Sequence, residues 1–294
     1  MKVSILIVTK NRKIELAKTL RVLEQYIDKS IHEVLVFDDG STDNTFELFE
    51  DFDWVTWERS CSSLGASLAR NKLYKNAKGS IFIGFDDDAH PLSENFISKT
   101  ESTFFLNPNV GIIAFQEIKG IYESDNAILN HIELDNQSYN TNDFVGCGFA
   151  VRKDVYEKTN GFPVWMDIYG EESCLALEVM NLGYDIRYES SIVVNHRVDR
   201  VKRLELKRNY FRFEKQLANT INLYLVYYSN PLFKIAKLLL HNFKKYALQD
   251  REYFKLFFKS LIKVVVSLPT TLKYRSPVKT KTNKKMATLR GIKY

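Results

Sequence analysis

Short apolar runs alternate with amphipathic stretches through the first third of this 294-residue chain, and this alternation constrains its fold more than any other feature. The apolar runs predict strands at residues 2–9, 33–37, 54–57 and 80–85. The stretches between them predict helices at residues 12–27, 42–52 and 64–76. Repeated strand–helix–strand units with apolar strands are typical of α/β proteins, in which helices cover both faces of a parallel sheet.

Polar residues follow these strands at the points where the strands end. Thr9 ends the first strand, Asp38 and Asp39 follow the second, and a run of aspartates from Asp86 to Asp88 follows the fourth. Ligands of open α/β sheets bind beyond the carboxyl ends of the strands. We therefore expect these residues to converge on one cleft.

The acidic triplet predicts a metal site. Side chains alternate along an extended chain, so Asp86 and Asp88 can point to one side while Asp87 points to the other. Two converging carboxylates suit a hard divalent cation that also binds phosphate oxygens. The competing interpretation is a solvated acidic turn. The residues after the triplet lack the glycine and the late glutamate of a calcium loop, and an aspartyl-phosphate enzyme usually carries its aspartate on the first strand.

The acids after the second strand have two interpretations. An acid at this place can bind a ribose hydroxyl, but dinucleotide-binding folds also need a glycine-rich turn after the first strand. That turn contains no glycine here, which argues against a Rossmann dehydrogenase. Thr9, Asn11 and Asp39 can still hold a nucleotide through its base and ribose. The alternative is that Asp38 and Ser41 cap the next helix.

Four more side chains are candidates for chemistry. Arg70 carries a permanently charged planar fork that suits a diphosphate, or it lies on the surface of an amphipathic helix. Glu171 and Glu172 begin a helix, whose dipole stabilises them, and one of them can serve as a general base. Only one can do so, because their side chains point about 100° apart. His196 ends a strand, where it is either a metal ligand or a hydrogen-bonded boundary residue.

The pattern changes beyond residue 91. Helices are predicted at residues 93–106, 154–159 and 171–182, strands at 110–115, 144–151, 186–188 and 192–194, and a long polar stretch at 120–142. Beyond His196 the chain becomes helical, basic and aromatic.

Charge is divided unevenly along the chain. Residues 1–196 carry a net charge of −13 and residues 197–294 a net charge of +19, within a total of +6. An acidic body with a strongly basic tail favours contact with an anionic surface, either nucleic acid or membrane. Nucleic acid is not expected as a partner, because no nucleic-acid-binding motif accompanies the charge.

The cysteines and the N-terminus indicate the compartment. Cys61, Cys147 and Cys174 are odd in number and widely spaced, and they form neither a disulfide framework nor a zinc pattern. They favour a reducing compartment, so we expect a cytoplasmic protein. The first apolar run is too short for a signal peptide, and no stretch approaches the length of a transmembrane helix.

The basic tail contains two predicted helices, at residues 231–248 and 253–268. In the second, Lys255, Lys259 and Lys263 recur every four residues, and apolar side chains cover most of the remainder. Basic amphipathic helices rich in Phe and Leu suit an anionic membrane interface, which would place the protein peripherally on the inner membrane face. The alternatives are that the helices pack on the first part of the chain or on a second subunit, as in a homodimer.

Taken in this order, the motifs resemble those of the family 2 glycosyltransferases, which have a GT-A fold. The matching segments are residues 3–12, 36–43 with Asp38-Asp39-Gly40-Ser41, 69–71, 85–88 with Asp86-Asp87-Asp88, 146–153, 160–162, 170–172 with Gly170-Glu171-Glu172, 183–184, and 194–196 ending at His196. Each motif is weak by itself, but the ordered set is specific and covers about residues 1–200. The resemblance implies an α/β fold with a mostly parallel central sheet flanked by helices, followed by a C-terminal helical extension.

The resemblance also implies a division of the chain. Residues 1–200 would form the GT-A catalytic domain, with a nucleotide-binding half at 1–90 and an acceptor half at 91–200, and residues 201–294 would form the basic, aromatic extension. The implied activity is metal-dependent transfer of a sugar from a nucleotide-diphosphate donor to an acceptor hydroxyl, usually with inversion. We expect a UDP-sugar, with dTDP- and GDP-sugars as alternatives, and a saccharide or lipid-linked acceptor in the synthesis of a surface polysaccharide or glycolipid.

The same resemblance assigns roles to residues. The nucleotide-sugar would be bound by Thr9, Asn11, Arg12, Asp38, Asp39, Arg70, Asp86 and Asp87. Mg²⁺ or Mn²⁺ would be bound by Asp86 and Asp88, with His196 as a further contact. Trp165 and Gly148 would contact the acceptor.

One departure from the family pattern concerns the catalytic base. The usual pair at the helix start is Glu-Asp, whose aspartate is the base, whereas this chain has Glu171-Glu172. Glu172 occupies the position of the base with a side chain that is one methylene longer. Two other functions stay open: a catalytically inactive sugar-nucleotide-binding protein, and a nucleotidyltransferase of similar fold, although the segment after the first strand lacks the glycine-rich loop of the latter.

Overall fold

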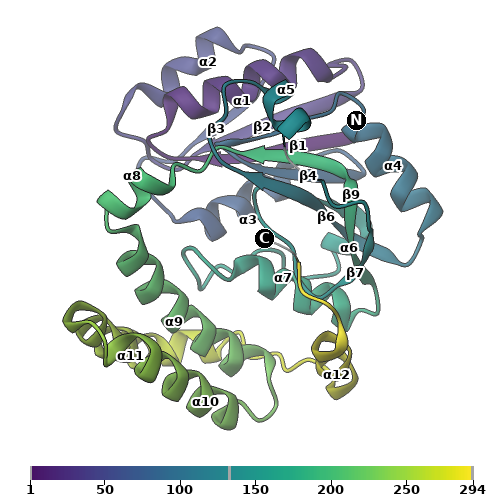
Figure 1. Ribbon diagram of the computed structural model, residues 1–294. Helices are drawn as coiled ribbons and strands as arrows, with labels where there is room; N and C mark the ends of the chain where they lie inside the picture. Colours follow the sequence, from purple (N-terminus) through teal and green to yellow (C-terminus); the bar gives the residue numbers. More distant parts are fainter. Residues whose placement is uncertain (1, 132–133, 293–294) are drawn as a thin grey trace.

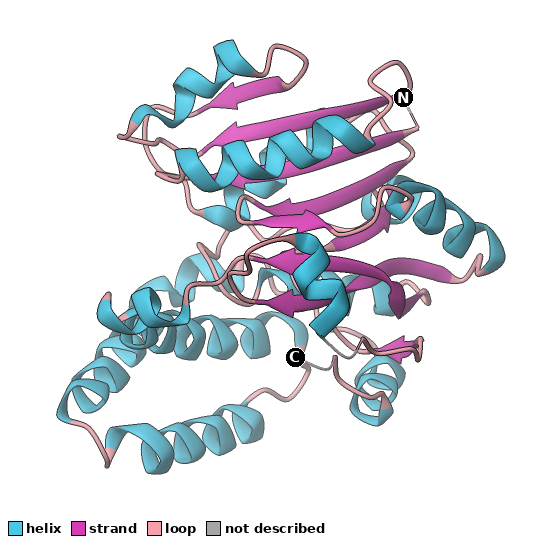
Figure 2. Ribbon diagram, turned by 45° about the horizontal axis from the view of Figure 1, so that its top comes forward, coloured by secondary structure: helices cyan, strands magenta, loops and turns pink. Residues whose placement is uncertain are grey.

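The computed structural model describes residues 2–131 and 134–292, and within them nine strands form a single sheet (Figure 2). The first part of the chain contains β1 (Val3–Thr9), α1 (Lys13–Tyr26), β2 (His32–Asp38), a 3-10 turn η1 (Asn44–Glu47), α2 (Leu48–Asp51), β3 (Thr56–Arg59), α3 (Ala66–Asn76) and β4 (Ile81–Asp86). The next part contains β5 (Ala89–Pro91), α4 (Phe96–Leu106), β6 (Val110–Lys119), α5 (Asp125–His131), β7 (Tyr139–Thr141), β8 (Phe149–Arg152), α6 (Lys153–Tyr156), α7 (Glu171–Asn181) and β9 (Asp185–His196). The last part contains α8 (Arg200–Glu205), α9 (Arg208–Tyr227), α10 (Leu232–Asn242), a π-helical turn η2 (Phe243–Ala247), α11 (Arg251–Leu272) and α12 (Thr280–Thr288).

The strand order brings several carboxyl ends to one edge of the sheet. The order is β3-β2-β1-β4-β8-β6-β9-β5, and β7 also pairs with β9. Strands β1 to β4 are mutually parallel. Because β8 is antiparallel to both β4 and β6, and β6 is parallel to β9, the strands β4, β6 and β9 run in the same direction. The α/β class is confirmed, and the parallel arrangement holds through β4 before the sheet becomes mixed.

Helices cover both faces of the sheet because the strand side chains alternate. In β1, Val3, Ile5 and Ile7 belong to the core that α1 and α4 cover, whereas Leu6 points to the opposite core, which α3 and α7 cover. Both cores consist of fully or nearly fully buried side chains. This rigid platform holds the loops at the carboxyl ends of the strands.

The C-terminal helices form a separate apolar cluster. Phe213 and Leu217 of α9 pack with Leu256 and Phe257 of α11, away from the sheet (Figure 1). The chain then returns to the catalytic part, where α12 lies beside α7 and the backbone N–H of Lys279 donates to the side-chain oxygen of Asn181 over 2.9 Å. None of the helices in the described residues combines the length and apolar character needed to cross a membrane.

Several predicted elements differ from the structure. The helix predicted at 42–52 is the 3-10 turn η1 followed by the four-residue helix α2, and the helix predicted at 231–248 is α10 followed by the π-helical turn η2. The strand predicted at residues 144–151 begins only at Phe149, because the glycine-containing segment before it forms a loop of the site. The two strands predicted at 186–188 and 192–194 are one strand, β9, whose pairing with β6 shifts between Phe115–Glu189 and Gln116–Val193 and leaves residues 190–192 out of the register. The polar stretch 120–142 contains α5 and β7, which were not expected.

Candidate active site

The candidate site lies at the edge where the carboxyl ends of β1, β2, β4 and β9 meet. Thr9 ends β1, Asp38 ends β2, Asp86 ends β4 and His196 ends β9. The first two strand ends touch directly, since the backbone N–H of Asp39 donates to the carbonyl oxygen of Thr9 over 2.9 Å. The predicted convergence of these strand ends is present in the structure.

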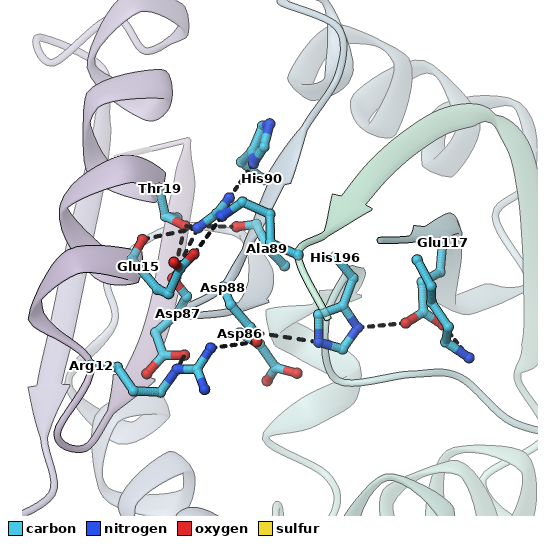
Figure 3. A network of polar contacts seen from close by, with 12 residues as sticks. Arg12, Glu15, Thr19, Asp86, Asp87, Asp88, Ala89, His90, Glu117 and His196 are labelled. Carbon is cyan, nitrogen blue, oxygen red and sulfur yellow. Dashed lines mark hydrogen bonds and ion pairs between the residues drawn. The ribbon is translucent and has the colours of Figure 1, made fainter. Parts of the chain in front are cut away.

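The three aspartates have different ion-pair partners or hydrogen-bond donors. Asp86 forms an ion pair with Arg70, with 2.6 Å between the nearest nitrogen and oxygen. Asp87 accepts a hydrogen bond of 2.8 Å from the Thr9 hydroxyl and pairs with Arg12 over 2.8 Å. Asp88 pairs with the other side of the Arg12 guanidinium over 2.5 Å (Figure 3).

Asp86, Asp88 and His196 converge. One carboxylate oxygen from each aspartate and one ring nitrogen of His196 all lie within 4.8 Å of one another. Asp87 has no part in this group, as predicted. Carboxylate oxygens suit Mg²⁺ and Mn²⁺, and imidazole is a common metal ligand, so the chemistry of these donors fits a divalent cation.

His196 is held at both ring nitrogens (Figure 3). Nε2 lies 3.2 Å from Asp88, and Nδ1 lies 2.5 Å from Glu117 near the end of β6. Burial lowers the pKa of His196, but the hydrogen bonds with Asp88, Cys147 and Glu117 outweigh it and raise the pKa to about 12. Metal-binding histidines commonly hold their second nitrogen against a carboxylate, which fixes the ring orientation, and Glu117 has that position.

Asp87 is buried beside the cluster of Asp86, Asp88 and His196. Burial raises the pKa of its carboxyl to about 7, against the opposing effects of Arg12 and of the Thr9 hydroxyl. Its backbone carbonyl accepts a hydrogen bond of 2.8 Å from the Thr19 hydroxyl of α1. The side chain therefore links β1 to the turn after β4.

Arg197 fixes that turn from the other side. Its guanidinium donates to the Glu15 carboxylate over 2.7 Å and to the Thr19 hydroxyl over 2.7 Å, and it contacts Nδ1 of His90. Its backbone N–H donates to the carbonyl of Asp88 over 2.8 Å. One buried arginine therefore connects α1, β5 and the end of β9.

Arg70 connects Asp86 to the start of α7. Besides Asp86, its guanidinium pairs with Glu171 over 3.0 Å and with Glu172 over 3.2 Å. Burial lowers its pKa, but these three carboxylates outweigh that effect and raise it. The predicted surface alternative for Arg70 does not hold, since only 8% of the residue is exposed.

The two glutamates of α7 differ in environment. The side chain of Glu171 is 3% exposed and that of Glu172 is 20% exposed. Burial, with the charge of Glu172, raises the pKa of Glu171 to about 8. Gly170 precedes them with φ of 114°, a backbone conformation that favours glycine. Glu172 is the carboxylate that solution and ligands can reach.

The loop before β8 closes around these groups. A Cβ atom on Gly146 would lie 2.5 Å from the Glu172 carboxylate and 2.6 Å from the Arg70 guanidinium, so any larger residue there would displace the ends of these two side chains. Nearby, the Asp143 carboxylate accepts a hydrogen bond of 2.7 Å from Ser173 of α7, and burial raises its pKa to about 6.

The predicted nucleoside-binding residues form hydrogen bonds with the loops next to them. Leu64 and Gly65 donate their backbone N–H groups to Asp39 over 2.6 and 3.1 Å. Asp38 accepts from the backbone N–H of Ser41 over 2.9 Å, but the residue that caps the following helical turn is Asp43, so the predicted capping by Asp38 and Ser41 is wrong. The side-chain oxygen of Asn11, whose φ is 54°, accepts a hydrogen bond from the backbone N–H of Thr42 in the next loop. These contacts shape the loops, and the nucleoside-binding roles stay predictions.

The two residues predicted to contact the acceptor differ in their surroundings. Gly148 is buried, and a Cβ atom there would lie 2.8 Å from Val194. Trp165 is half-buried beside an apolar cluster formed by the loop before α7, α7 itself and α9. Contact with an acceptor stays a prediction for both.

The sequence reasoning missed Glu117, Asp143 and Arg197. Glu117 and Asp143 lie in a strand and a loop without a recognisable motif, and only the three-dimensional pairing brings them to the site. Arg197 directly follows His196, so its place beside a strand end was a signal that the prediction did not use.

Comparisons with known proteins agree with this geometry. The family model described as "Glycosyl transferase family 2" matches residues 4–159. A search of curated proteins finds no match.

Several solved structures share the fold. TarS residues 1–349 from S. aureus is 14% identical with a TM-score of 0.60, and the likeness covers 92% of this chain and 82% of that chain. The mannosyltransferase PcManGT from Pyrobaculum calidifontis, solved with GDP-Man and Mn²⁺, is 17% identical with a TM-score of 0.59 over 97% and 83% of the two chains. GalNAc-T7, solved with UDP, GalNAc and Mn²⁺, is 13% identical with a TM-score of 0.64 over 92% and 57%. The likeness confirms the GT-A fold predicted from the motifs.

Proposed function

The chain belongs to glycosyl transferase family 2, and from that premise we propose that it transfers a sugar from a nucleotide-diphosphate donor to an acceptor hydroxyl, in a metal-dependent reaction that inverts the anomeric carbon. One observation carries this proposal. The Arg70 guanidinium contacts Asp86 of the metal group on one side and Glu172 on the other. Arg70, the residue proposed to bind the diphosphate, therefore contacts both the proposed metal site and the proposed base.

The donor is proposed to be a UDP-sugar. Its nucleoside would contact Thr9, Asn11, Arg12, Asp38 and Asp39, and its diphosphate would contact Arg70. S. aureus TarS has been solved with UDP-GlcNAc, which supports a uridine donor, whereas the GDP-Man complex of PcManGT keeps a GDP-sugar as an alternative. A dTDP-sugar is the third candidate.

Asp86, Asp88 and His196 would hold the metal, with Glu117 orienting His196. A divalent cation bound there, Mg²⁺ or Mn²⁺, would supply Lewis-acid neutralisation of the leaving diphosphate. Arg70 adds a fixed positive charge to the same region. Its three carboxylate partners keep it charged and in place before a donor arrives.

Glu172 is proposed as the general base. It takes the proton from the acceptor hydroxyl as that oxygen bonds to the anomeric carbon, and the bond from this carbon to the diphosphate oxygen breaks. Attack from the face opposite the leaving group inverts the anomeric configuration. Glu171 is held against Arg70 in a buried position and supports the guanidinium.

The acceptor is proposed to be a saccharide or a lipid-linked saccharide, used in building a surface polysaccharide or glycolipid. Trp165 and Gly148 stay proposed acceptor contacts. The basic C-terminal helices are proposed to bring the enzyme to an anionic membrane surface; pairing of two copies through the same helices is the competing proposal.

The test uses a panel of UDP-, dTDP- and GDP-sugars incubated with the enzyme in Mn²⁺, in Mg²⁺ and in EDTA. We expect slow metal-dependent release of nucleoside diphosphate from one donor class even without acceptor, and NMR of the transferred product should show an inverted anomeric carbon. Asp88→Asn should lower this release at least a hundredfold.

The rival functions give different results. An inactive sugar-nucleotide-binding protein would bind a donor without releasing nucleoside diphosphate. A nucleotidyltransferase would release pyrophosphate from a nucleoside triphosphate in the presence of a sugar phosphate. Either result would overturn the proposal.

A further inference from the structure

Helices α10 and α11 present an apolar surface to solvent. We call it the basic apolar face, and it comprises Leu232, Phe233, Leu240, Phe254, Phe258, Ile262, Val265 and Val266, every one of them exposed. Exposed apolar residues of this size normally occur singly on a soluble protein, and a contiguous group marks a contact surface.

Helix α11 is apolar on two opposite sides. One side, with Leu256, Phe257 and Val264, is buried against α9. The other side carries Phe254, Phe258, Ile262 and then Val265 and Val266, at the helical spacing of a single stripe. Ile262 is 65% exposed and Val266 is 75% exposed. Nothing in the described residues covers this second side.

Helix α10 carries further exposed apolar side chains. It has no buried residue, and its Leu232 and Phe233 are 77% and 79% exposed. The π-helical turn that follows connects it to α11, because the ring of Phe243 lies 6.2 Å from that of Phe254 and 5.4 Å from that of Phe257. Figure 1 shows α10 and α11 together at the end of the molecule away from the sheet.

Lysines border the apolar stripe. On α11, Lys255, Lys259 and Lys263 directly follow Phe254, Phe258 and Ile262, so each lies about 100° further around the helix than a stripe residue. Lys255 pairs with Glu252, and Lys259 and Lys263 both pair with Glu214 of α9, so the charge of these three lysines is partly neutralised. On α10, Lys237 is exposed, as is Lys244 in the turn after it, and neither makes an ion pair among the described residues. The surface is thus apolar in its centre and cationic along its border.

We propose that the basic apolar face docks on the surface of an anionic lipid bilayer. The apolar side chains would enter the boundary between headgroups and acyl chains, and the lysines would contact anionic headgroups. Charge favours lipid over a second copy, because self-pairing would bring together two segments that each carry +19. The acidic remainder of the chain, at −13, would be repelled by the bilayer, so the helices would face the lipid.

This inference names the surface through which the proposed membrane contact occurs. It does not depend on the transfer reaction, since neither the donor nor the metal group takes part. The binding experiment is therefore done without nucleotide-sugar, and release of nucleoside diphosphate is measured separately on the same variants. Failure of one proposal leaves the other intact.

The experiment measures co-sedimentation of the full chain with vesicles. One set contains equal parts of phosphatidylglycerol and phosphatidylcholine, and the other contains phosphatidylcholine alone. We expect binding to the anionic vesicles that weakens with added salt, and at least tenfold weaker binding to the neutral ones.

Two pairs of double variants locate the surface. Ile262→Gln with Val266→Gln removes two exposed apolar groups while keeping good helix formers, and should lower the vesicle affinity at least tenfold. The matched control is Phe105→Gln with Leu106→Gln, which removes exposed apolar groups of α4 and should change nothing.

A second double variant with its own control tests the contribution of the lysines. Lys237→Gln with Lys244→Gln should lower affinity for anionic vesicles about 30-fold, at roughly fivefold for each lysine. Lys75→Gln with Lys78→Gln, exposed in the catalytic part, is the control.

Three outcomes would overturn the proposal. These are equal binding to neutral and anionic vesicles, unchanged binding in the α11 variant, and no vesicle binding by the wild type. Light scattering would reveal the competing occupant: a wild-type dimer that becomes a monomer in the α11 variant, without vesicle binding, would assign the face to a second copy.

Discussion

Glu171 and Glu172 are neighbours in sequence, yet their surroundings assign them different chemistry. Glu172→Gln should lower the rate of transfer by about 10²–10⁴-fold with donor affinity retained, because an amide cannot take the acceptor proton. Steady-state kinetics and calorimetric titration of the donor would measure the two effects. Glu171→Gln is the matched control: the Glu171 side chain is only 3% exposed and lies against Arg70, so an acceptor hydroxyl cannot reach it and most of the transfer rate should remain. A Glu172→Gln enzyme that keeps its activity would show that another residue is the general base.

Gly146 provides the space in which Arg70 and Glu172 meet. Gly146→Ala would place a methyl group 2.5 Å from the Glu172 carboxylate, which must then shift. We expect transfer to fall at least tenfold, since small misplacements of a catalytic group are costly. Gly291→Ala, with no heavy atom within 4 Å of the added carbon, should leave the rate unchanged. Equal rates in the two variants would contradict this account of the loop.

Asp143 makes stability depend on pH in a defined direction. Burial raises its pKa to about 6 from 3.8, so its contribution to stability is present below about pH 4 and is lost as pH rises through 6. Asp143→Asn cannot ionise and should therefore gain about 2 kcal/mol of unfolding free energy relative to wild type between about pH 4 and pH 7. Urea unfolding at both pH values measures this. Asp53→Asn, on the surface, serves as the control, and a pH-independent difference for Asp143→Asn would refute the prediction.

The grouping of Asp86 with Asp88, without Asp87, was predicted correctly but for a reason that does not hold. The prediction assumed an extended chain, whereas Asp87 and Asp88 lie in the turn after β4. Glu117 was not predictable from the sequence, because its contact with His196 joins strands 79 residues apart along the chain. A sequence without a motif at Glu117 carries no sign of that pairing.

At the scale of elements, the end of β9 is clamped to α1. Arg197→Ala would remove the contacts with Glu15, Thr19 and His90 and leave polar groups unpaired, so the unfolding free energy should fall by about 3 kcal/mol. Arg187→Ala on the same strand removes a more exposed ion pair with Glu189 and should cost less than about 1 kcal/mol. Equal losses in urea unfolding would show that Arg197 is not a clamp.

The long elements followed from periodicity, and the short ones did not. The helices α1, α3 and α11 lie close to their predicted bounds because each repeats its apolar pattern over several turns. The strands β5 and β7 have three residues each, too few to show any period, and they form only because β9 offers them an edge. Their existence is a property of the sheet as a whole.

For the whole molecule, metal binding should appear as added stability. Mn²⁺ at a hundred times its dissociation constant should raise the unfolding free energy by about 2.7 kcal/mol, and EDTA should reverse the change. Thermal unfolding with and without Mn²⁺ measures it. The increment, rather than the absolute stability, should vanish in Asp88→Asn and persist in Asp53→Asn. An increment that survives in Asp88→Asn would place the cation elsewhere.

The overall organisation was largely readable from the sequence. The reversal of charge near residue 197 marks the end of the sheet-containing part and the start of the helical one. What the sequence could not reveal is the return of α12 to α7, because the Lys279–Asn181 and Lys285–Asp185 contacts depend on how the intervening helices fold back. The division of the chain into two domains stays a prediction.

That return has a mechanical consequence. Asn219 of α9 donates to the backbone carbonyls of Ile168 and Tyr169, just before the helix that carries the proposed base, while α12 is attached to the far end of the same helix. A helical segment attached at one point can rotate about it, whereas a segment attached at two points cannot rotate freely. Attachment at both points therefore limits how far the helices between them can rotate relative to α7.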